Sequence, residues 1–318
     1  MKSHPNRRDL LKTGALAALP FWAAARPGGA TPGNPGPAPT VGIATFGFPE
    51  LSNQELAREL ATAGINTVQL FLAQTDSRYW VYNGRSDLSD LSPQRCQDIA
   101  EIYRAEGIAI HSLGVYTNLL HPDEDERKAN LDYFEAMFRV GAAMGVHCFI
   151  TESGHYEPPP EERTGLYHFR DEVWTRMVDA GKDLARRAEA HDAVVLFEPY
   201  YLGFLASARR SRLFLEAVGS PRIRALLDAA NLLEVNDLEE MFGQLAPYVD
   251  CLHAKDRKLH VQRGVAAGQG DLDYRNYVAL AAKHAPHAPF ILEYVGLADY
   301  KEALAVLHAA IQAQQDKG

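Results

Sequence analysis

The sequence predicts a (β/α)8 barrel, and three observations support this prediction. Short β-rich runs alternate eight times with amphipathic helical stretches between residue 41 and the C-terminus. The body formed by these repeats has about 275 residues, close to the barrel size of roughly 250. A doubly wound sheet also alternates, but its first turn usually carries GxGxxG, whereas this chain has Thr45-Phe46-Gly47-Phe48-Pro49 there. The count of eight therefore favours the barrel.

The expected elements follow from residue type and period. Strands are predicted at 41–46, 67–71, 109–115, 147–151, 194–198, 223–228, 249–253 and 290–294. Helices are predicted at 53–63, 93–106, 129–144, 171–190, 208–218, 237–245, 274–284 and 300–313. Ser52 and the Ser92-Pro93 pair are typical of helix starts, while Gly64, Gly107 and Gly145 are typical of helix ends.

The first forty residues have a different composition. Residues 1–25 combine the Arg7-Arg8 pair, an apolar run of ~13 residues and an Ala23-x-Ala25 end, which together indicate an export signal. The arginine pair followed by Leu-Leu-Lys resembles the twin-arginine type, and this predicts export to the periplasm. Residues 26–40 contain five prolines and four glycines and are predicted to be a linker, so the barrel is expected at 41–318. The apolar run is too short to span a bilayer, which needs roughly 20 residues, and no second apolar run of comparable strength appears, so no membrane-spanning segment is predicted.

Composition and charge exclude several classes of protein. Hydrophobic residues make up 47% and charged residues 23%, which is ordinary for a globular chain. The net charge of −9 argues against a nucleic-acid partner, because phosphates attract basic surfaces. The 3 cysteines cannot all pair, and no CxxC motif is present. No pattern in the sequence indicates an oligomeric state.

The last four predicted strands each end in a side chain that can bind metal. They read LFEPY, LLDAAN, LHAKD and ILEYV, and the side chains are those of Glu198, Asp228, His253 and Glu293. The carboxyl ends of barrel strands meet at one mouth, where three carboxylates repel one another unless a cation lies among them. Three oxygens and one nitrogen suit Mn²⁺, Co²⁺, Mg²⁺ or Zn²⁺, and the absence of cysteine argues against structural zinc. The pattern predicts one divalent ion in an open, catalytic arrangement.

These motifs, in this order, resemble the xylose-isomerase-like barrel superfamily, which includes sugar phosphate isomerases/epimerases, ketose 3-epimerases, hydroxypyruvate isomerases and inosose dehydratases. The run 268–274 (GQGDLDY) is similar to a segment that enters the seventh helix in many members. The resemblance makes the four strand-end residues ligands of one ion, with Glu198 and Glu293 as the acid/base pair. It also differs from the ketose 3-epimerases, which carry Asn-Arg after Glu-Pro and a histidine at the position of Asn231. The match is therefore to the broader isomerase/epimerase group.

The function implied by this resemblance is a metal-dependent sugar isomerase or epimerase that acts through an enediolate on a small sugar. A lyase or dehydratase acting on a keto-sugar or glycoside remains open, because its first proton abstraction is identical. A non-catalytic sugar-binding barrel is a third reading, although binding alone does not need two opposed carboxylates. DNA-repair endonucleases of the superfamily need many more histidines at strand ends and a basic groove. This chain offers one strong strand-end histidine and a net negative charge, which argues against that function.

Further residues are predicted to contact the substrate. Lys255 lies two residues after His253 and therefore shares its strand face. His111, Asn231 and Arg257 complete the predicted substrate-binding set, although a single histidine within a strand is more often a core residue. The other candidates lie in strand-to-helix loops, and they are Glu152, His155, His260 and the aromatic residues Trp80, Tyr82, Tyr116, Tyr200 and Tyr201.

Overall fold

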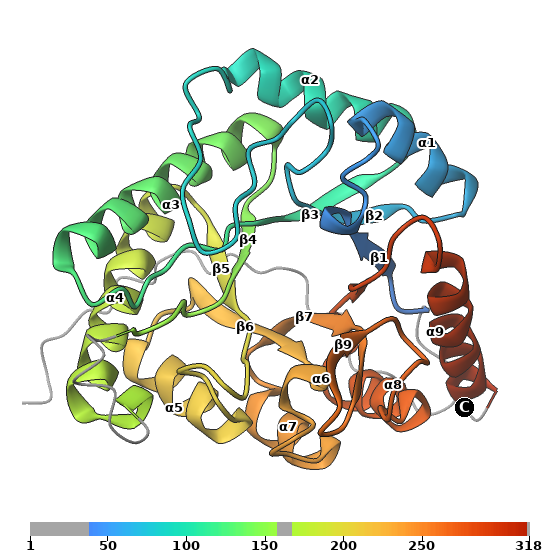
Figure 1. The fold of residues 1–318 in the computed structure, drawn as a ribbon. Helices are drawn as coiled ribbons and strands as arrows, with labels where there is room; N and C mark the ends of the chain where they lie inside the picture. The colour runs from blue at the N-terminus through green and yellow to red at the C-terminus, as the bar shows by residue number, and fades with distance from the viewer. Residues whose placement is uncertain (1–37, 158–166, 317–318) are drawn as a thin grey trace, which may run out of the picture. The chain divides into compact units, whose positions relative to one another are not determined.

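The computed structural model describes residues 38–157 and 167–316, and these fold into a closed barrel of eight parallel strands (Figure 1). The predicted fold is confirmed. The first and last barrel strands pair in parallel, with Val41 opposite Phe290, and this pairing closes the ring. In order around the barrel the strands are β1 (Val41–Ala44), β2 (Thr67–Leu70), β3 (Ala109–Gly114), β4 (Cys148–Thr151), β5 (Val194–Phe197), β6 (Ile223–Asp228), β7 (Val249–Ala254) and β10 (Phe290–Leu292).

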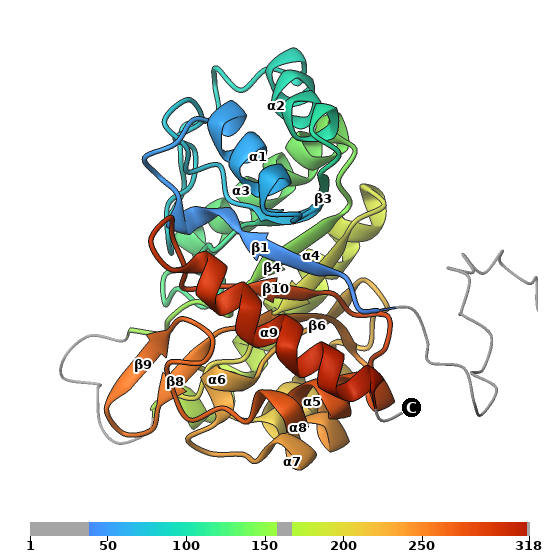
Figure 2. The ribbon, with the colours of Figure 1, turned by 90° about the vertical axis from the view of Figure 1, so that its right-hand side faces the viewer.

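Helices surround the strands, and each barrel strand leads into at least one of them (Figure 1). Figure 2 shows α9 crossing in front of β1 and β10, where the barrel closes. The helices are α1 (Asn53–Thr62), α2 (Pro93–Ala105), α3 (Glu124–Met144), α4 (Asp171–Ala190), α5 (Ala208–Val218), α6 (Ala229–Leu232), α7 (Leu238–Leu245), α8 (Tyr274–His284) and α9 (Tyr300–Gln315).

The helix boundaries show how local sequence sets these elements. Ser52 caps α1 in a capping box with Glu55, and Ser92 caps α2, as predicted. The glycines predicted to end helices all adopt a left-handed φ of +74° to +76°. The predicted start of α3 at residue 129 was wrong, because the helix begins at Glu124. The side chain of Asp123 accepts a hydrogen bond from the Glu126 N–H, and acidic residues in the first turn favour the helix dipole.

A hairpin that the sequence did not predict lies between β7 and α8. It consists of β8 (Asp256–Lys258) and β9 (Gln262–Val265), which pair in antiparallel fashion and project from the barrel (Figure 2). The carboxylate of Asp256 is fully buried and accepts hydrogen bonds from three backbone N–H groups, those of Arg257, Gly268 and Leu272. These bonds fix the base of the hairpin beside the strand ends.

The barrel interior is filled by side chains that lie on the eight strands or within two residues of their ends. They form one apolar cluster made of Ala44, Phe71, Tyr116, Ile150, Leu196, Leu226, Cys251 and Ile291. A larger cluster fills the space between strands and helices, for example where the rings of Phe138 and Phe149 lie 4.8 Å apart. The polar strand ends therefore stand above a closed apolar floor.

The predicted export signal at residues 1–25 and most of the predicted linker at 26–40 lie outside the described residues, so both stay predictions. Within the described ranges, no helix has the length and apolar character needed to cross a membrane.

Candidate metal centre

The four predicted metal ligands come together at the mouth of the barrel. Glu198 directly follows β5, Asp228 ends β6, His253 lies near the end of β7 and Glu293 directly follows β10. One ligand atom from each residue lies within 4.8 Å of the others, and all four residues are buried. Because β5, β6, β7 and β10 are neighbours in the barrel, residues far apart in sequence form a single cluster.

The imidazole of His253 faces all three carboxylates. Its Nδ1 lies 3.4 Å from Glu198 Oε1, 3.6 Å from Asp228 Oδ2 and 3.4 Å from Glu293 Oε2. This buried nitrogen has no hydrogen-bond partner, an arrangement that normally costs free energy. Metal bonds of about 2.0–2.2 Å would separate two ligands of one tetrahedral ion by roughly 3.4 Å. The donor types and their spacing therefore fit a divalent ion.

A glutamine across the barrel fixes the orientation of this imidazole. His253 Nε2 donates a hydrogen bond of 2.8 Å to Oε1 of Gln69, which is fully buried on β2. The amide oxygen can only accept, so Nε2 carries the proton and the lone pair of Nδ1 faces the carboxylates. A partner that fixes the ring in this way is typical of histidines that bind metals.

Lys255 supplies a positive charge beside the same carboxylates. Its Nζ lies 2.8 Å from Asp228 Oδ2, 2.9 Å from Glu293 Oε2 and 3.9 Å from Glu198 Oε1. Burial raises the pKa of Asp228, but the Lys255 ammonium and the adjacent His253 side chain together outweigh it and hold that pKa below its ordinary value. Burial raises the pKa of Glu198, and the charge of Glu293 adds to this effect. Three carboxylates against one ammonium leave a negative excess that a cation would neutralise.

Neutral side chains hold Glu198 in place. Asn231 Nδ2 donates to Glu198 Oε1 at 2.7 Å, and the hydroxyl of Tyr116 donates to Glu198 Oε2 at 2.8 Å. Asn231 is placed by the short helix α6, at whose start the side chain of Asp228 accepts a bond of 3.0 Å from the Asn231 N–H. Asp228 thus has two roles, since one oxygen caps the helix while the other faces the imidazole.

A cavity of about 480 Å³ opens beside the cluster. Its lining includes Glu198, Asn231, Lys255 and Glu293 together with Phe46, Phe71, Trp80, Tyr82, Tyr116, Glu152, His155, Tyr200, Arg263 and Tyr294. The hydroxyl of Tyr82 donates a bond of 2.8 Å to Glu152 Oε2. Burial raises the pKa of Glu152 to about 8, and the charge of Glu198 adds to this shift. The cavity therefore holds a carboxyl group that is mostly neutral at pH 7, outside the ligand set.

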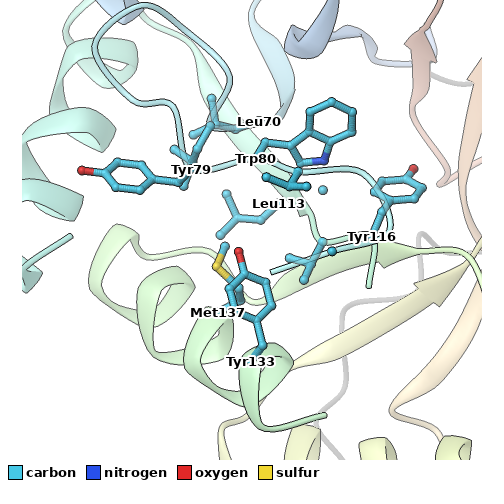
Figure 3. Close-up of a pocket in the computed structure, with 12 residues that line it drawn as sticks. Leu70, Tyr79, Trp80, Leu113, Tyr116, Tyr133 and Met137 are labelled. Atoms are coloured by element: carbon cyan, nitrogen blue, oxygen red, sulfur yellow. The ribbon is translucent and has the colours of Figure 1, made fainter. Parts of the chain in front are cut away.

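The aromatic side of this cavity is backed by packed side chains. Behind Trp80 and Tyr116 lies a second pocket of only about 10 Å³ (Figure 3). Its other labelled lining residues are Leu70, Tyr79, Leu113, Tyr133 and Met137. A space of this size holds about one water molecule. Trp80 and Tyr116 are therefore packed against other side chains, with almost no empty space behind them.

The fold and this site agree with a match to a known family. A family model for the xylose isomerase-like TIM barrel matches residues 57–310. The chain belongs to this family. The matched span includes all four residues of the candidate metal centre. No curated protein sequence matches the chain.

Solved structures with the xylose isomerase-like fold resemble this barrel closely in shape and weakly in sequence. A D-psicose 3-epimerase with D-tagatose from Clostridium cellulolyticum H10 has a TM-score of 0.66 at 15% identity, covering 87% of this chain and 98% of that chain. The probable 3-DHS dehydratase AsbF from Bacillus anthracis has a TM-score of 0.66 at 14% identity, covering 86% and 98%. The IOLI protein with a bound zinc atom has a TM-score of 0.67 at 16% identity, covering 87% and 98%. At these identities the likeness shows a shared fold.

Two of the four predicted substrate-binding residues of this xylose isomerase-like barrel line the cavity, and two do not. Lys255 and Asn231 are part of the lining. The guanidinium of Arg257 is buried instead, where Nε donates to the Ala230 carbonyl at 2.6 Å and Nη1 to Glu234 Oε1 at 3.1 Å. His111 lies on β3 away from the lining, with Nδ1 3.1 Å from Ser112 Oγ, and burial lowers its pKa to about 4. Arg257 and His111 thus make contacts within the fold.

The loop candidates divide in the same way. Tyr201 lies under the Arg257 guanidinium at 4.6 Å, and His260 pairs with Glu234 at 2.8 Å, so neither lines the cavity. Sequence reasoning missed Gln69, Arg263 and Tyr294. Gln69 is a polar residue between Val68 and Leu70 in the strand Thr67–Leu70, and that contrast was a usable signal. The candidates that do line the cavity are Trp80, Tyr82, Tyr116, Glu152, His155 and Tyr200.

Proposed function

We propose that the protein is a divalent-metal-dependent sugar isomerase or epimerase. The observation that carries this proposal is the buried cluster of Glu198, Asp228, His253 and Glu293 beside a cavity of about 480 Å³. Membership of the xylose isomerase-like barrel family supports it, as does the shared fold with a D-psicose 3-epimerase. Pockets of this volume are typical of small-molecule sites.

The two sides of the cavity suit the two faces of a sugar. Lys255 and Asn231 present donors to carbonyl and hydroxyl oxygens beside the carboxylates. The rings of Trp80, Tyr82 and Tyr116 also line the cavity and can pack on C–H groups. A substrate held between them would have its oxygens directed at the candidate metal centre.

Glu198 and Glu293 are the proposed proton carriers. One carboxylate removes a proton from the carbon next to the carbonyl, and the C–H electron pair moves into the enediolate. Return of a proton to the neighbouring carbon gives an isomer, whereas return to the opposite face of the same carbon gives an epimer. A bound divalent ion would supply Lewis-acid stabilisation of the enediolate charge. The ammonium of Lys255, 2.9 Å from Glu293 Oε2, is placed to lower the energy of the same charge.

Wash-in of solvent deuterium tests this proposal. The full chain, loaded with Mn²⁺ or Co²⁺, is incubated in D₂O with a panel of keto-sugars, and the labelled carbon is located by NMR. We expect metal-dependent exchange, and Glu293→Gln should lower its rate by roughly a hundredfold or more. Glu239→Gln, which changes an exposed glutamate on α7, is the matched control and should exchange normally. Absence of metal-dependent exchange with every keto-sugar would overturn the proposal.

One observation favours a lyase or dehydratase as the second candidate. The Tyr82–Glu152 pair places a largely neutral carboxyl group in the cavity, outside the ligand set. In an elimination, the electron pair left by the departing proton expels an oxygen on the next carbon, and Glu152 would protonate that oxygen. Glu152→Gln should then abolish formation of the elimination product, while deuterium exchange into the substrate continues. Absence of any elimination product from the wild type would argue against this candidate and leave the isomerase or epimerase.

The N-terminal 25 residues have the composition of an export signal. We propose that residues 1–25 direct export through the twin-arginine route, because Arg7-Arg8 precedes a short apolar run. Replacement of both arginines by lysine should retain the protein in the cytoplasm, as measured by cell fractionation. Unchanged export of the double variant would contradict the route.

A further inference from the structure

The hairpin β8–β9 carries one cation that faces the cavity without an acidic partner. Arg263 on β9 is part of the cavity lining, at its exposed rim, and its Nη1 lies 3.2 Å from the hydroxyl of Tyr200. In the described part of the chain no carboxylate pairs with it. Arg257 and His260 of the same hairpin both pair with Glu234, and Lys258 is exposed and does not line the cavity.

The hairpin is held firmly enough to aim this side chain. Buried Asp256 fixes its base through three backbone N–H groups, and Arg257 ties it to the Ala230 carbonyl. Next to Arg263, Gly264 lies against the ring of Tyr294, where an added Cβ would come within 2.4 Å of the ring carbon Cε1. Only glycine permits this close approach. The backbone on one side of Arg263 is therefore packed against the rim of the cavity.

The charges around the cavity leave Arg263 free to receive an anion. Among the described lining residues the side chains with a permanent positive charge are Lys255 and Arg263. Lys255 is already engaged at 2.8 Å by Asp228 and at 2.9 Å by Glu293. Arg263 has a hydroxyl neighbour that can donate to the same group. A planar guanidinium beside a hydroxyl matches the two oxygens of a carboxylate.

We propose that Arg263 and Tyr200 bind a carboxylate of the substrate, so that the preferred substrate is a sugar acid such as a uronic acid or its glycoside. The assignment rests on the proposed isomerase or epimerase function and specifies its substrate class. A carboxylate is favoured over a phosphate because phosphate sites generally gather several backbone N–H donors, at a helix N-terminus or a nest, and the contacts of Arg263 include none. The sugar ring would lie between the rim and the candidate metal centre.

Matched ligands test this inference on the full chain loaded with Mn²⁺. Binding is measured by isothermal titration calorimetry for methyl uronides and the corresponding neutral methyl glycosides in the gluco, galacto and manno configurations. We expect at least one uronide to bind tenfold or more tightly than its neutral partner. Arg263→Gln should reduce that preference to within about twofold, and Arg263→Lys should retain part of it. Lys258→Gln is the matched control, since it removes an exposed cation of the same hairpin that does not line the cavity.

Each other result is decisive. No preference for a uronide in any pair, absence of binding included, overturns the inference, and so does a preference that survives in Arg263→Gln. Tighter binding of glucose 6-phosphate than of the uronides would overturn the assignment to a carboxylate. Deuterium exchange keeps the two proposals distinct. A chain that exchanges deuterium with neutral keto-sugars but shows no uronide preference retains its proposed function and loses only this substrate class.

Discussion

The two halves of the barrel mouth differ in chemistry. The strands β5, β6, β7 and β10 contribute the four candidate ligands, and β7 leads into Lys255. The strands β1, β2 and β3 are followed by aromatic rings, and those of Phe71 and Trp80 lie 5.3 Å apart while those of Phe71 and Tyr116 lie 5.7 Å apart. One half thus holds the charged side chains, and the other offers an aromatic surface. The candidate metal ligands and the aromatic rings of the cavity therefore come from different strands.

Removal of one candidate ligand from the charged half should have the largest effect, and the effect should be on metal binding. Asp228→Ala removes an oxygen from the cluster and leaves Lys255 with fewer carboxylates, so we expect the affinity for Mn²⁺ to fall a hundredfold or more by calorimetry. Because an ion that binds the native state stabilises it, addition of a chelator should lower the Tm of the wild type and leave that of the variant nearly unchanged. Asp98→Asn, an exposed residue on α2, is the control. Wild-type affinity in Asp228→Ala would exclude this residue as a ligand.

Gln69 connects the two halves, and its loss should have the next largest effect. Gln69→Ala leaves His253 free to turn, so metal affinity should fall by about ten- to a hundredfold. Gln69→Glu keeps an acceptor oxygen and should restore most of it. Gln74→Ala removes another buried glutamine, whose amide donates to the Thr45 carbonyl, and it controls for lost packing. Equal metal affinity in Gln69→Ala and Gln74→Ala would contradict the positioning role.

The aromatic half should respond in substrate binding rather than in metal binding. Trp80→Leu removes part of the ring surface, and we expect substrate affinity to fall about tenfold, which corresponds to about 1.4 kcal/mol. The affinity for Mn²⁺ should stay within twofold. Tyr79→Leu changes a ring that lines the small pocket but not the main cavity, and it should leave substrate affinity unchanged. A Trp80→Leu variant with altered metal binding and normal substrate binding would refute the division between halves.

His111 should show the smallest effect, and only at acidic pH. Its pKa in the folded chain, about 4, lies below the ordinary value of 6.5, so the folded state binds fewer protons between these values. The contribution of the neutral imidazole to the free energy of unfolding is therefore present in full above pH 6.5. It is lost as the pH falls towards 4, and the loss is about 3 kcal/mol at most. Urea unfolding should show no such pH-dependent loss of stability in His111→Leu. The control His308→Leu, which changes an exposed residue on α9, should lose stability with falling pH as the wild type does. Reduced substrate affinity at pH 7 in His111→Leu would return this residue to the site.

The sequence was sufficient for the fold and for the ligand cluster because both follow from local patterns. The alternation of strand and helix predicts a barrel, and the barrel brings the ends of neighbouring strands together, so Glu198, Asp228, His253 and Glu293 could be named in advance. The choice between Arg257 and Arg263 could not be made in this way. These residues lie on a hairpin whose pairing register decides which side chain faces the cavity, and the hairpin itself was not predicted. Gln69 also depends on contact across the barrel.

The bond between Gln69 and His253 joins side chains 184 positions apart and limits how modular the site can be. A fragment running from β5 through Glu293 would contain every candidate ligand, yet it would lack the group that orients the imidazole. Grafting those strands onto another half-barrel would therefore transfer the ligands without their geometry, unless the new β2 supplied an acceptor at the same height. The candidate metal centre therefore depends on the whole ring of strands, and not only on the half that carries the candidate ligands.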